Sequence, residues 1–121
     1  MKIKNIKFKA KQLNSGKWFE GDLVRLGNRV CIGGDHIKDG ITDVDPSTVC
    51  MFTGLKDCEG KELFEHDVIK NYPFLPSEIV WSEELSGYYL THANGKIYEK
   101  PLGYYLSLGK FIVVGNKFDA K

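Results

Sequence analysis

The sequence predicts a mainly β fold made of two small, barrel-like units of the SH3 kind packed together, with at most short helical turns. Three observations support this prediction. β-Branched and aromatic residues occur in short runs, these runs are separated by Gly, Asn, Asp and Pro, and helical periodicity is scarce. With 121 residues, 42% of them apolar, the chain can form one core or two small subdomains, but not two large independent domains. We therefore expect residues 1–121 to be a single domain, with an N-terminal β meander at 1–50 and a C-terminal β barrel at 51–121.

The first subdomain is predicted to contain consecutive antiparallel strands. Strands are expected at residues 4–13, 17–26 and 29–32, because turn-forming residues separate these runs. Residues 33–45 contain three glycines and four aspartates, which predicts a connecting loop. Extended chain is expected to resume at residues 48–53.

The second subdomain is predicted to contain more and shorter strands. Its expected strands lie at residues 63–64, 67–71, 78–81, 87–91 and 96–98. Pro73 and Pro76 interrupt strand pairing because proline lacks the backbone donor. Asn94 and Gly95 give the strongest hairpin signal in the chain. One helical turn is expected at residues 102–106, and the apolar run 111–114 predicts a strand buried on both faces.

One short pattern occurs twice. Residues 19–25 (FEGDLVR) and 64–70 (FEHDVIK) share an aromatic residue, an acid, a variable position, Asp, an apolar pair and a base. Such a segment suits a tight turn that leads into the first strand of a small barrel, where Asp accepts hydrogen bonds from nearby amides. The repetition favours two related units; the alternative is convergence on one turn type.

The charge balance argues against a dedicated nucleic-acid or membrane protein. The 17 Lys and Arg residues nearly equal the 16 Asp and Glu residues, so no global field attracts a polyanion. Locally, Lys7, Lys9 and Lys11 alternate with apolar residues, as in a strand that buries one face and exposes the other. The alternative for these three lysines is a phosphate-contacting strip.

Neither a membrane span nor a disulfide framework is predicted. No run of about 18 apolar residues occurs, and no apolar signal segment follows the lysine-rich start, so we expect a cytoplasmic protein. Cys31, Cys50 and Cys58 are odd in number and lack close spacing, which predicts reduced thiols.

The most specific segment of the chain is residues 52–69, FTGLKDCEGKELFEHDVI. It closely resembles the central signature of the YopX family, and residues 6–10 and 113–116 resemble the two ends of the family pattern. The chain departs from this pattern at Met51, where the family usually has a polar residue, and at His66, where it has glycine. Histidine tolerates a positive φ better than β-branched residues do, so the turn is expected to survive. The resemblance implies a phage or prophage accessory protein and transfers no catalytic residues.

Within this signature, Gly54, Asp57, Gly60 and Asp67 are predicted to be turn-forming, structural residues. The alternative, in which the acids form a carboxylate pair or a metal site, is disfavoured because Asp57 and Gly60 bracket a turn and Asp67 suits the cap of another. The three histidines lie in separate segments without a recognisable metal or nucleophile motif. We therefore expect no catalytic residues, metal or cofactor, and no enzyme.

The last third of the chain is rich in aromatic residues, and its tyrosines are the candidate partner-binding residues. Tyr88, Tyr89, Tyr104 and Tyr105 are the named candidates; the alternative is that most of them fill the core. The sequence thus favours a non-enzymatic protein-binding or adaptor module, whose partner is a host or phage protein. The same features would also support self-association. The second hypothesis is weak nucleic-acid binding through the N-terminal lysines and an aromatic surface.

Overall fold

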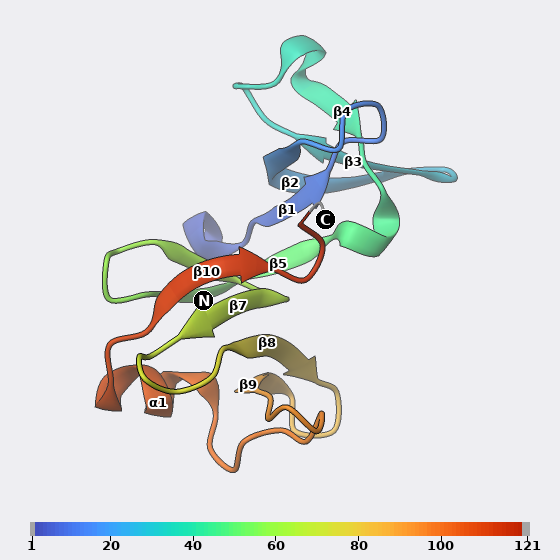
Figure 1. Cartoon of the computed structure of the whole chain (residues 1–121). Helices are drawn as coiled ribbons and strands as arrows, with labels where there is room; N and C mark the ends of the chain where they lie inside the picture. The colour runs from blue at the N-terminus through green and yellow to red at the C-terminus, as the bar shows by residue number, and fades with distance from the viewer. Residues whose placement is uncertain (1, 120–121) are drawn as a thin grey trace. The chain divides into compact units, whose positions relative to one another are not determined.

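A computed structural model describes residues 2–119 of the chain and divides it into two compact units, Met1–Phe52 and Thr53–Lys121 (Figure 1). We call these unit 1 and unit 2. The observed boundary lies two residues beyond the predicted one. The prediction of a mainly β protein is confirmed, since the described part contains ten strands and a single α-helix of seven residues.

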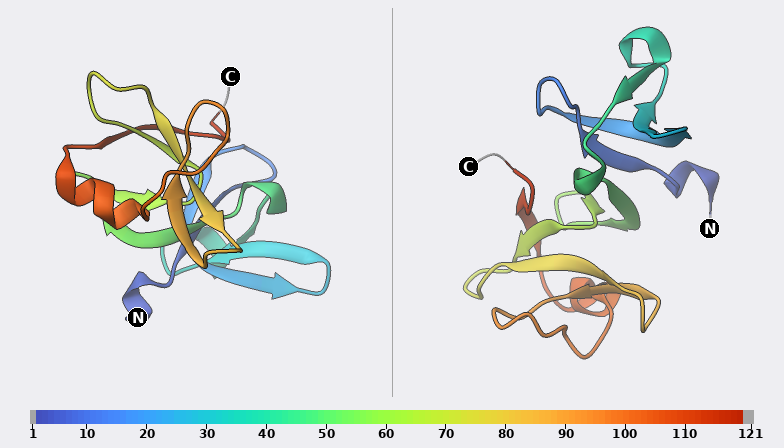
Figure 2. Two further views of the ribbon diagram at one scale, coloured as in Figure 1. Left: turned by 90° about the horizontal axis from the view of Figure 1, so that it is seen from below. Right: turned by 90° about the vertical axis from the view of Figure 1, so that its right-hand side faces the viewer.

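Unit 1 is built from β1 (Phe8–Lys11), β2 (Trp18–Leu26), β3 (Arg29–Gly33), β4 (Ile41–Asp43) and the start of β5 (Cys50–Lys56). Their order is β4-β3-β2-β1-β5, with antiparallel neighbours. Figure 2 shows β2 and β3 as a long hairpin. A short 3-10 turn, η1 (Ile3–Asn5), precedes β1, and two others, η2 (Lys38–Gly40) and η3 (Pro46–Thr48), lie between strands.

The core of unit 1 agrees only in part with the predicted alternation along β1, since Ala10 is buried but Ile6 is 42% exposed. Ala10 is fully buried and packs with Ile32, Ile37 and Val44. Glycine is required at position 21, because a Cβ there would lie 2.2 Å from the carbonyl oxygen of Gly33 on the paired strand β3. The absence of a side chain lets β2 and β3 pair closely.

The prediction that residues 33–45 form only a connecting loop was wrong, because this segment contains the strand β4. This strand pairs with β3 through Ile41, Thr42 and Asp43. The Asp43 carboxylate accepts hydrogen bonds from the guanidinium of Arg29 at 2.8 Å and from the thiol of Cys31 at 3.0 Å. These contacts come from distant positions on β3, so local turn propensity gave no sign of them.

Unit 2 contains the rest of β5, together with β6 (Glu62–Phe64), β7 (Asp67–Lys70), β8 (Ser77–Ser82), β9 (Gly87–Leu90), α1 (Leu102–Leu108) and β10 (Ile112–Asn116). β6 neighbours β5, and a second sheet has the order β10-β7-β8-β9 with antiparallel pairing. Its core consists of Leu63, Ile69, Ile79, Leu90 and Leu102, and partly buried aromatic residues pack around it. Figures 1 and 2 show α1 in the chain segment that leads into β10.

Two strand predictions in unit 2 need correction. Residues 96–98 form only an isolated bridge between Thr91 and Ile97, although Gly95 makes the predicted turn with φ +85°. β10 is not buried on both faces, since Ile112 and Val114 are 37% and 51% exposed. A continuous apolar run therefore does not by itself decide how many faces a strand buries.

The repeated pattern does not produce the same structure twice. Residues 19–25 lie inside the continuous strand β2, whereas residues 64–70 pass from β6 through a turn into β7. Asp22 is exposed, whereas the matching Asp67 is 1% exposed. Within residues 2–119 the strand orders are those of open sheets, so the predicted SH3-like barrel units are not confirmed.

Candidate functional site

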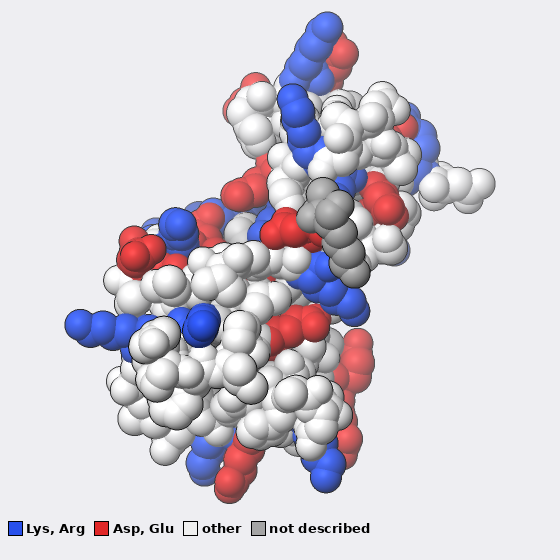
Figure 3. Space-filling model, viewed as in Figure 1, with Lys and Arg blue, Asp and Glu red and all other residues white. Residues whose placement is uncertain are grey.

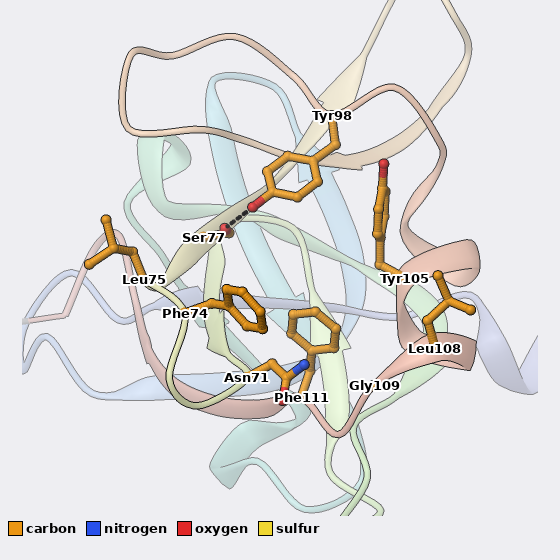
Figure 4. Close-up of a pocket in the computed structure, with 9 residues that line it drawn as sticks. All are labelled: Asn71, Phe74, Leu75, Ser77, Tyr98, Tyr105, Leu108, Gly109 and Phe111. Atoms are coloured by element: carbon orange, nitrogen blue, oxygen red, sulfur yellow. Dashed lines mark hydrogen bonds between the residues drawn. The ribbon is translucent and has the colours of Figure 1, made fainter.

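Unit 2 contains an apolar pocket of about 250 Å³, shown in Figure 4. Three chain segments form it: the connection between β7 and β8, the segment before α1, and the end of α1 with the residues that follow. The lining residues are Asn71, Phe74, Leu75, Ser77, Tyr98, Tyr105, Leu108, Gly109 and Phe111. Side chains distant in the sequence thus meet around one hollow.

The β7–β8 connection forms the outer wall of the pocket. Its two prolines, at positions 73 and 76, keep it out of the sheet, and the N–H of Phe74 donates to the carbonyl oxygen of Asn71 at 2.8 Å. The side chains of Tyr72, Phe74 and Leu75 are 84%, 66% and 77% exposed. This connection therefore presents three large apolar side chains to solvent.

α1 forms the opposite wall. Leu102 is buried in the core, while Tyr105 and Leu108, three residues apart on the helix, line the pocket. Leu108 is 67% exposed. A Cβ at Gly109 would lie 2.5 Å from the side-chain nitrogen of Asn71, so glycine at this position lets the end of α1 approach the connection closely.

A row of four aromatic rings passes beside the pocket, in the order His92, Tyr98, Tyr105, Tyr104. His92 and Tyr98 stack with their centroids 4.1 Å apart, and the next two contacts are edge-on at 5.0 and 5.2 Å. We call this set the aromatic row. Such contacts hold the rings in fixed orientations.

The hydroxyl groups of the two lining tyrosines are engaged within unit 2. The Tyr98 hydroxyl lies 3.3 Å from Ser77 Oγ, a bond drawn in Figure 4. The Tyr105 hydroxyl accepts the backbone N–H of Lys100 at 3.2 Å. What these side chains offer to a ligand is therefore mainly their apolar ring surface.

A second cavity of about 250 Å³ adjoins the pocket and shares four of its lining residues, Phe74, Leu75, Ser77 and Tyr98. The remaining lining residues are Pro76, Thr91, His92 and Ala93. In the view of Figure 3, most of the visible surface of unit 2 consists of residues other than Lys, Arg, Asp and Glu. The pocket and the second cavity thus meet at four shared residues.

The four predicted tyrosines have different surroundings. Tyr104 is 46% exposed, and Tyr105 lines the pocket. Tyr88 packs against the core and lies edge-on to Trp81 at 5.0 Å, while Tyr89 is only 9% exposed. The structure therefore brings Tyr104 and Tyr105 to the pocket region but leaves Tyr89 little surface for a partner. Their roles in binding stay predictions.

The sequence analysis did not single out Phe74, Leu75 or Leu108. One signal was available: two large apolar residues stand between Pro73 and Pro76, in a connection that cannot pair as a strand. Apolar residues in such a connection lie outside the sheet and are candidates for an exposed patch.

The three predicted nucleic-acid lysines lie beside aromatic rings in unit 1. The ammonium groups of Lys9 and Lys11 are 4.8 and 5.6 Å from the centroid of the Trp18 ring, and that of Lys7 is 5.0 Å from the Phe52 ring. A shallow cavity of about 550 Å³ adjoins them, lined by Lys7, Trp18, Phe19, Glu20, Gly21 and His36. Contact between these lysines and nucleic acid stays a prediction.

Asp57 connects a turn of the signature segment to β10. One carboxylate oxygen accepts the backbone N–H groups of Glu59 and Lys61 at 2.9 and 2.8 Å, and the other accepts that of Val113 at 3.1 Å. Burial raises the pKa of Asp57, but the three backbone donors and the charge of Lys61 lower it by more than burial raises it. The net pKa is therefore below its ordinary value. Gly54 and Gly60 have φ values of +86° and +85°.

Asp67 occupies the next turn of the signature. One of its oxygens accepts the N–H of Phe64 at 2.8 Å, and the other accepts the side-chain N–H of Asn116 at 2.9 Å. His66 stands at φ +70°, as expected for a residue that replaces glycine in this turn, and its Nδ1 lies 2.7 Å from Glu78. These acids hold main-chain turns together.

Two further kinds of feature that bear on function are metal-ligand clusters and membrane-spanning helices. Among residues 2–119, no group of three or more His, Cys, Asp or Glu side chains could hold a metal ion. No helix within the same residues is long and apolar enough to cross a membrane. Cys31 and Cys50 are buried, Cys58 is exposed, and none of the three forms a disulfide within the described residues.

Comparison with known protein families matches residues 6–120 to the family described as YopX protein. The match includes the whole signature segment and both units. No curated protein matches the chain.

Proposed function

The chain belongs to the YopX protein family, and we propose that it is a non-enzymatic protein-binding module that engages its partner through the pocket of unit 2. One observation carries this proposal. Phe74, Leu75 and Leu108 line the same pocket, and each is about two-thirds or more exposed. Apolar side chains gathered on a surface in this way are typical of sites that a partner covers. Their burial on binding would supply the favourable free energy.

The size of the pocket fits a protein partner. Sites for small molecules usually measure about 300–1,000 Å³. A hollow of about 250 Å³, bounded by fixed aromatic rings, fits one large apolar side chain of a partner. Such an arrangement, an anchor in a preformed pocket with an apolar rim, is typical of the residues that dominate protein interfaces.

The partner in this proposal is a protein of a phage or of its bacterial host. The protein would then serve as an accessory or adaptor factor inside the host cell. A second copy of the chain is the alternative partner, and sedimentation of the purified protein distinguishes it, because self-association depends on protein concentration.

Binding tests need variants that remove the apolar rim without disturbing the core. Phe74→Ser and Leu108→Ser meet this condition because both side chains are largely exposed. Leu85→Ser is the matched control, since Leu85 is 52% exposed and lies outside the residues that line the pocket. Each tagged variant would be isolated, after nuclease treatment, from cells in which the protein is naturally made, and its bound proteins identified by mass spectrometry.

We expect a protein that copurifies with the wild type and with Leu85→Ser, and that is lost with the two pocket variants. Removal of an anchor contact costs about 2 kcal/mol or more, which corresponds to about a 30-fold weaker affinity. Equal recovery with all variants would reject the pocket as the binding site.

A second candidate function is nucleic-acid binding by unit 1. It is supported by Lys7, Lys9 and Lys11, whose ammonium groups lie beside the rings of Phe52 and Trp18, and by the nine Lys and Arg residues against six Asp and Glu residues in this unit. Binding of labelled single-stranded DNA should then weaken steeply as salt rises, because phosphate contacts release counterions. Affinity that is independent of salt would reject this candidate.

A further inference from the structure

Charge is distributed unevenly around the pocket of unit 2. The two segments that surround it, residues 70–77 and 91–111, contain four lysines and one acid: Lys70, Lys96, Lys100, Lys110 and Glu99. The remaining residues of unit 2 contain four lysines against nine Asp and Glu residues. The apolar pocket is therefore bordered by positively charged segments in a unit that is otherwise acidic.

Two of these lysines are joined to the pocket by a shared residue. Lys70 and Lys110 line a neighbouring cavity of about 430 Å³ together with Cys58, Asn71, Tyr72 and Ile112. Asn71 lines both this cavity and the apolar pocket. A segment that places a side chain in the pocket would thus pass Asn71 to reach the two ammonium groups.

The lysines also lie close to the exposed rings. The ammonium group of Lys70 is 5.6 Å from the centroid of the Tyr72 ring, and that of Lys100 is 6.0 Å from the Tyr104 ring. Tyr72 and Tyr104 are 84% and 46% exposed. Exposed aromatic rings and lysine ammonium groups therefore lie close together. A partner that covers these rings must also contact the lysines.

We infer that the pocket takes a short acidic peptide segment with one large apolar side chain. The apolar side chain enters the pocket, and adjacent Asp or Glu side chains lie against Lys70 and Lys110. This inference rests on the proposed function and adds the chemistry of the partner. Charge complementarity supports it, because opposite potentials across an interface select the partner and speed its association.

Nucleic acid is a poorer match for the same lysines. A long polyanion would meet the acids of unit 2 as well, which outnumber its lysines by ten to eight. A short peptide needs only the local surplus of positive charge. Nucleobases are also planar and polar at their edges, whereas the hydroxyls beside the pocket are already engaged by Ser77 and by the Lys100 backbone.

The test uses the full-length chain and an array of short synthetic peptides. Each peptide has a central Phe, Leu, Tyr or Trp, flanked by Asp and Glu, by Ser and Gly, or by Lys and Arg. We expect the acid-flanked peptides to bind most tightly. The best binder should lose about three- to tenfold in affinity with Lys70→Gln/Lys110→Gln, because exposed ion pairs are weak individually. The control Lys56→Gln/Lys117→Gln removes the same charge elsewhere in unit 2 and should leave the affinity unchanged.

The outcomes separate this inference from the proposed function. Neutral peptides that bind as tightly as acidic ones, and lose affinity with Phe74→Ser, would overturn the acidic specificity and keep the pocket as a binding site. Peptide binding that Phe74→Ser does not weaken would overturn both. Binding of single-stranded DNA or of anionic vesicles that requires Lys70 and Lys110, without any binding of acidic peptides, would also overturn the inference.

Discussion

Replacement of Asp57 by asparagine tests how the signature turn supports unit 2. Asp57 is 6% exposed, and its carboxylate accepts three backbone N–H groups, one of them 56 residues away on β10. Asp57→Asn keeps the size of the side chain but replaces one acceptor oxygen with an NH₂ group. In either orientation, at least one backbone N–H then faces another donor.

The cost follows from this geometry. A hydrogen bond to a charged group contributes about 1.5–3 kcal/mol, and a buried donor without a partner costs about 1–3 kcal/mol. In the less costly orientation of the amide, Asp57→Asn loses the bond to Val113 and removes the charge from the bonds to Glu59 and Lys61; in the other orientation it loses those two bonds. We therefore expect the free energy of unfolding to fall by about 2–4 kcal/mol, a large part of the roughly 5–15 kcal/mol typical of a whole protein.

The effect depends on pH in a definite direction. The folded state lowers the pKa of Asp57 from its ordinary value of 3.8, because its backbone donors and Lys61 outweigh the burial that raises it. A lowered folded pKa means that the carboxylate stabilises the protein fully above the unfolded pKa and loses this contribution as the pH falls through the folded value. The difference between wild type and Asp57→Asn should therefore be large at neutral pH and shrink below about pH 4.

Urea unfolding followed by circular dichroism measures the free energy of unfolding of each variant and how this free energy changes with pH. Glu59→Gln is the matched control, because it removes the same charge from an exposed position in the same turn and should change stability by no more than about 0.5 kcal/mol. If Asp57→Asn is as stable as Glu59→Gln, or if its deficit is unchanged between neutral and strongly acidic pH, the proposed role of the carboxylate is wrong.

Three further predictions concern glycines. Gly60 and Gly54 have positive φ values and open space around them, so valine at either position should cost about 1–2 kcal/mol through backbone strain alone. Alanine at Gly103, an exposed residue of α1, should instead raise stability by about 0.5–1 kcal/mol, and thermal unfolding that ranks the variants otherwise would refute this account. Gly21→Ala should cost about 2 kcal/mol or more in urea unfolding, because its Cβ would overlap the carbonyl oxygen of Gly33; an unchanged midpoint would show that β2 and β3 separate easily.

Much of the strand pattern could be predicted because it depends on local alternation. Ala10 is buried between two partly exposed lysines in β1, as a period of two requires. The turn at His66 was also predictable, since its conformation belongs to the turn itself. Whether the strands close into a barrel was not predictable, because closure depends on which strands pair over long distances. For the same reason β4 was not predicted, since contacts of Asp43 with β3 hold it in place.

The candidate site was less predictable than the fold. Tyr105 was predicted from composition, but Phe74 and Leu108 were not. These two residues belong to the candidate site because their side chains are exposed and line the same pocket. Exposure depends on what the rest of the chain covers, and adjacency on how α1 approaches the β7–β8 connection. A sequence pattern gives the identity of a side chain and the face of the strand or helix on which it lies, but not the neighbours that the fold brings to it.

The signature turn and the pocket are connected through one lining residue. Next to Asp57, the N–H of Cys58 donates to the carbonyl oxygen of Phe111 at 3.0 Å, and Asp57 itself accepts the N–H of Val113. These two bonds fix the backbone on both sides of position 112, and the Phe111 ring lines the pocket. Asp57 and Cys58 therefore position one wall of the proposed binding site. A change at Asp57 should weaken peptide binding even though its carboxylate does not line the pocket.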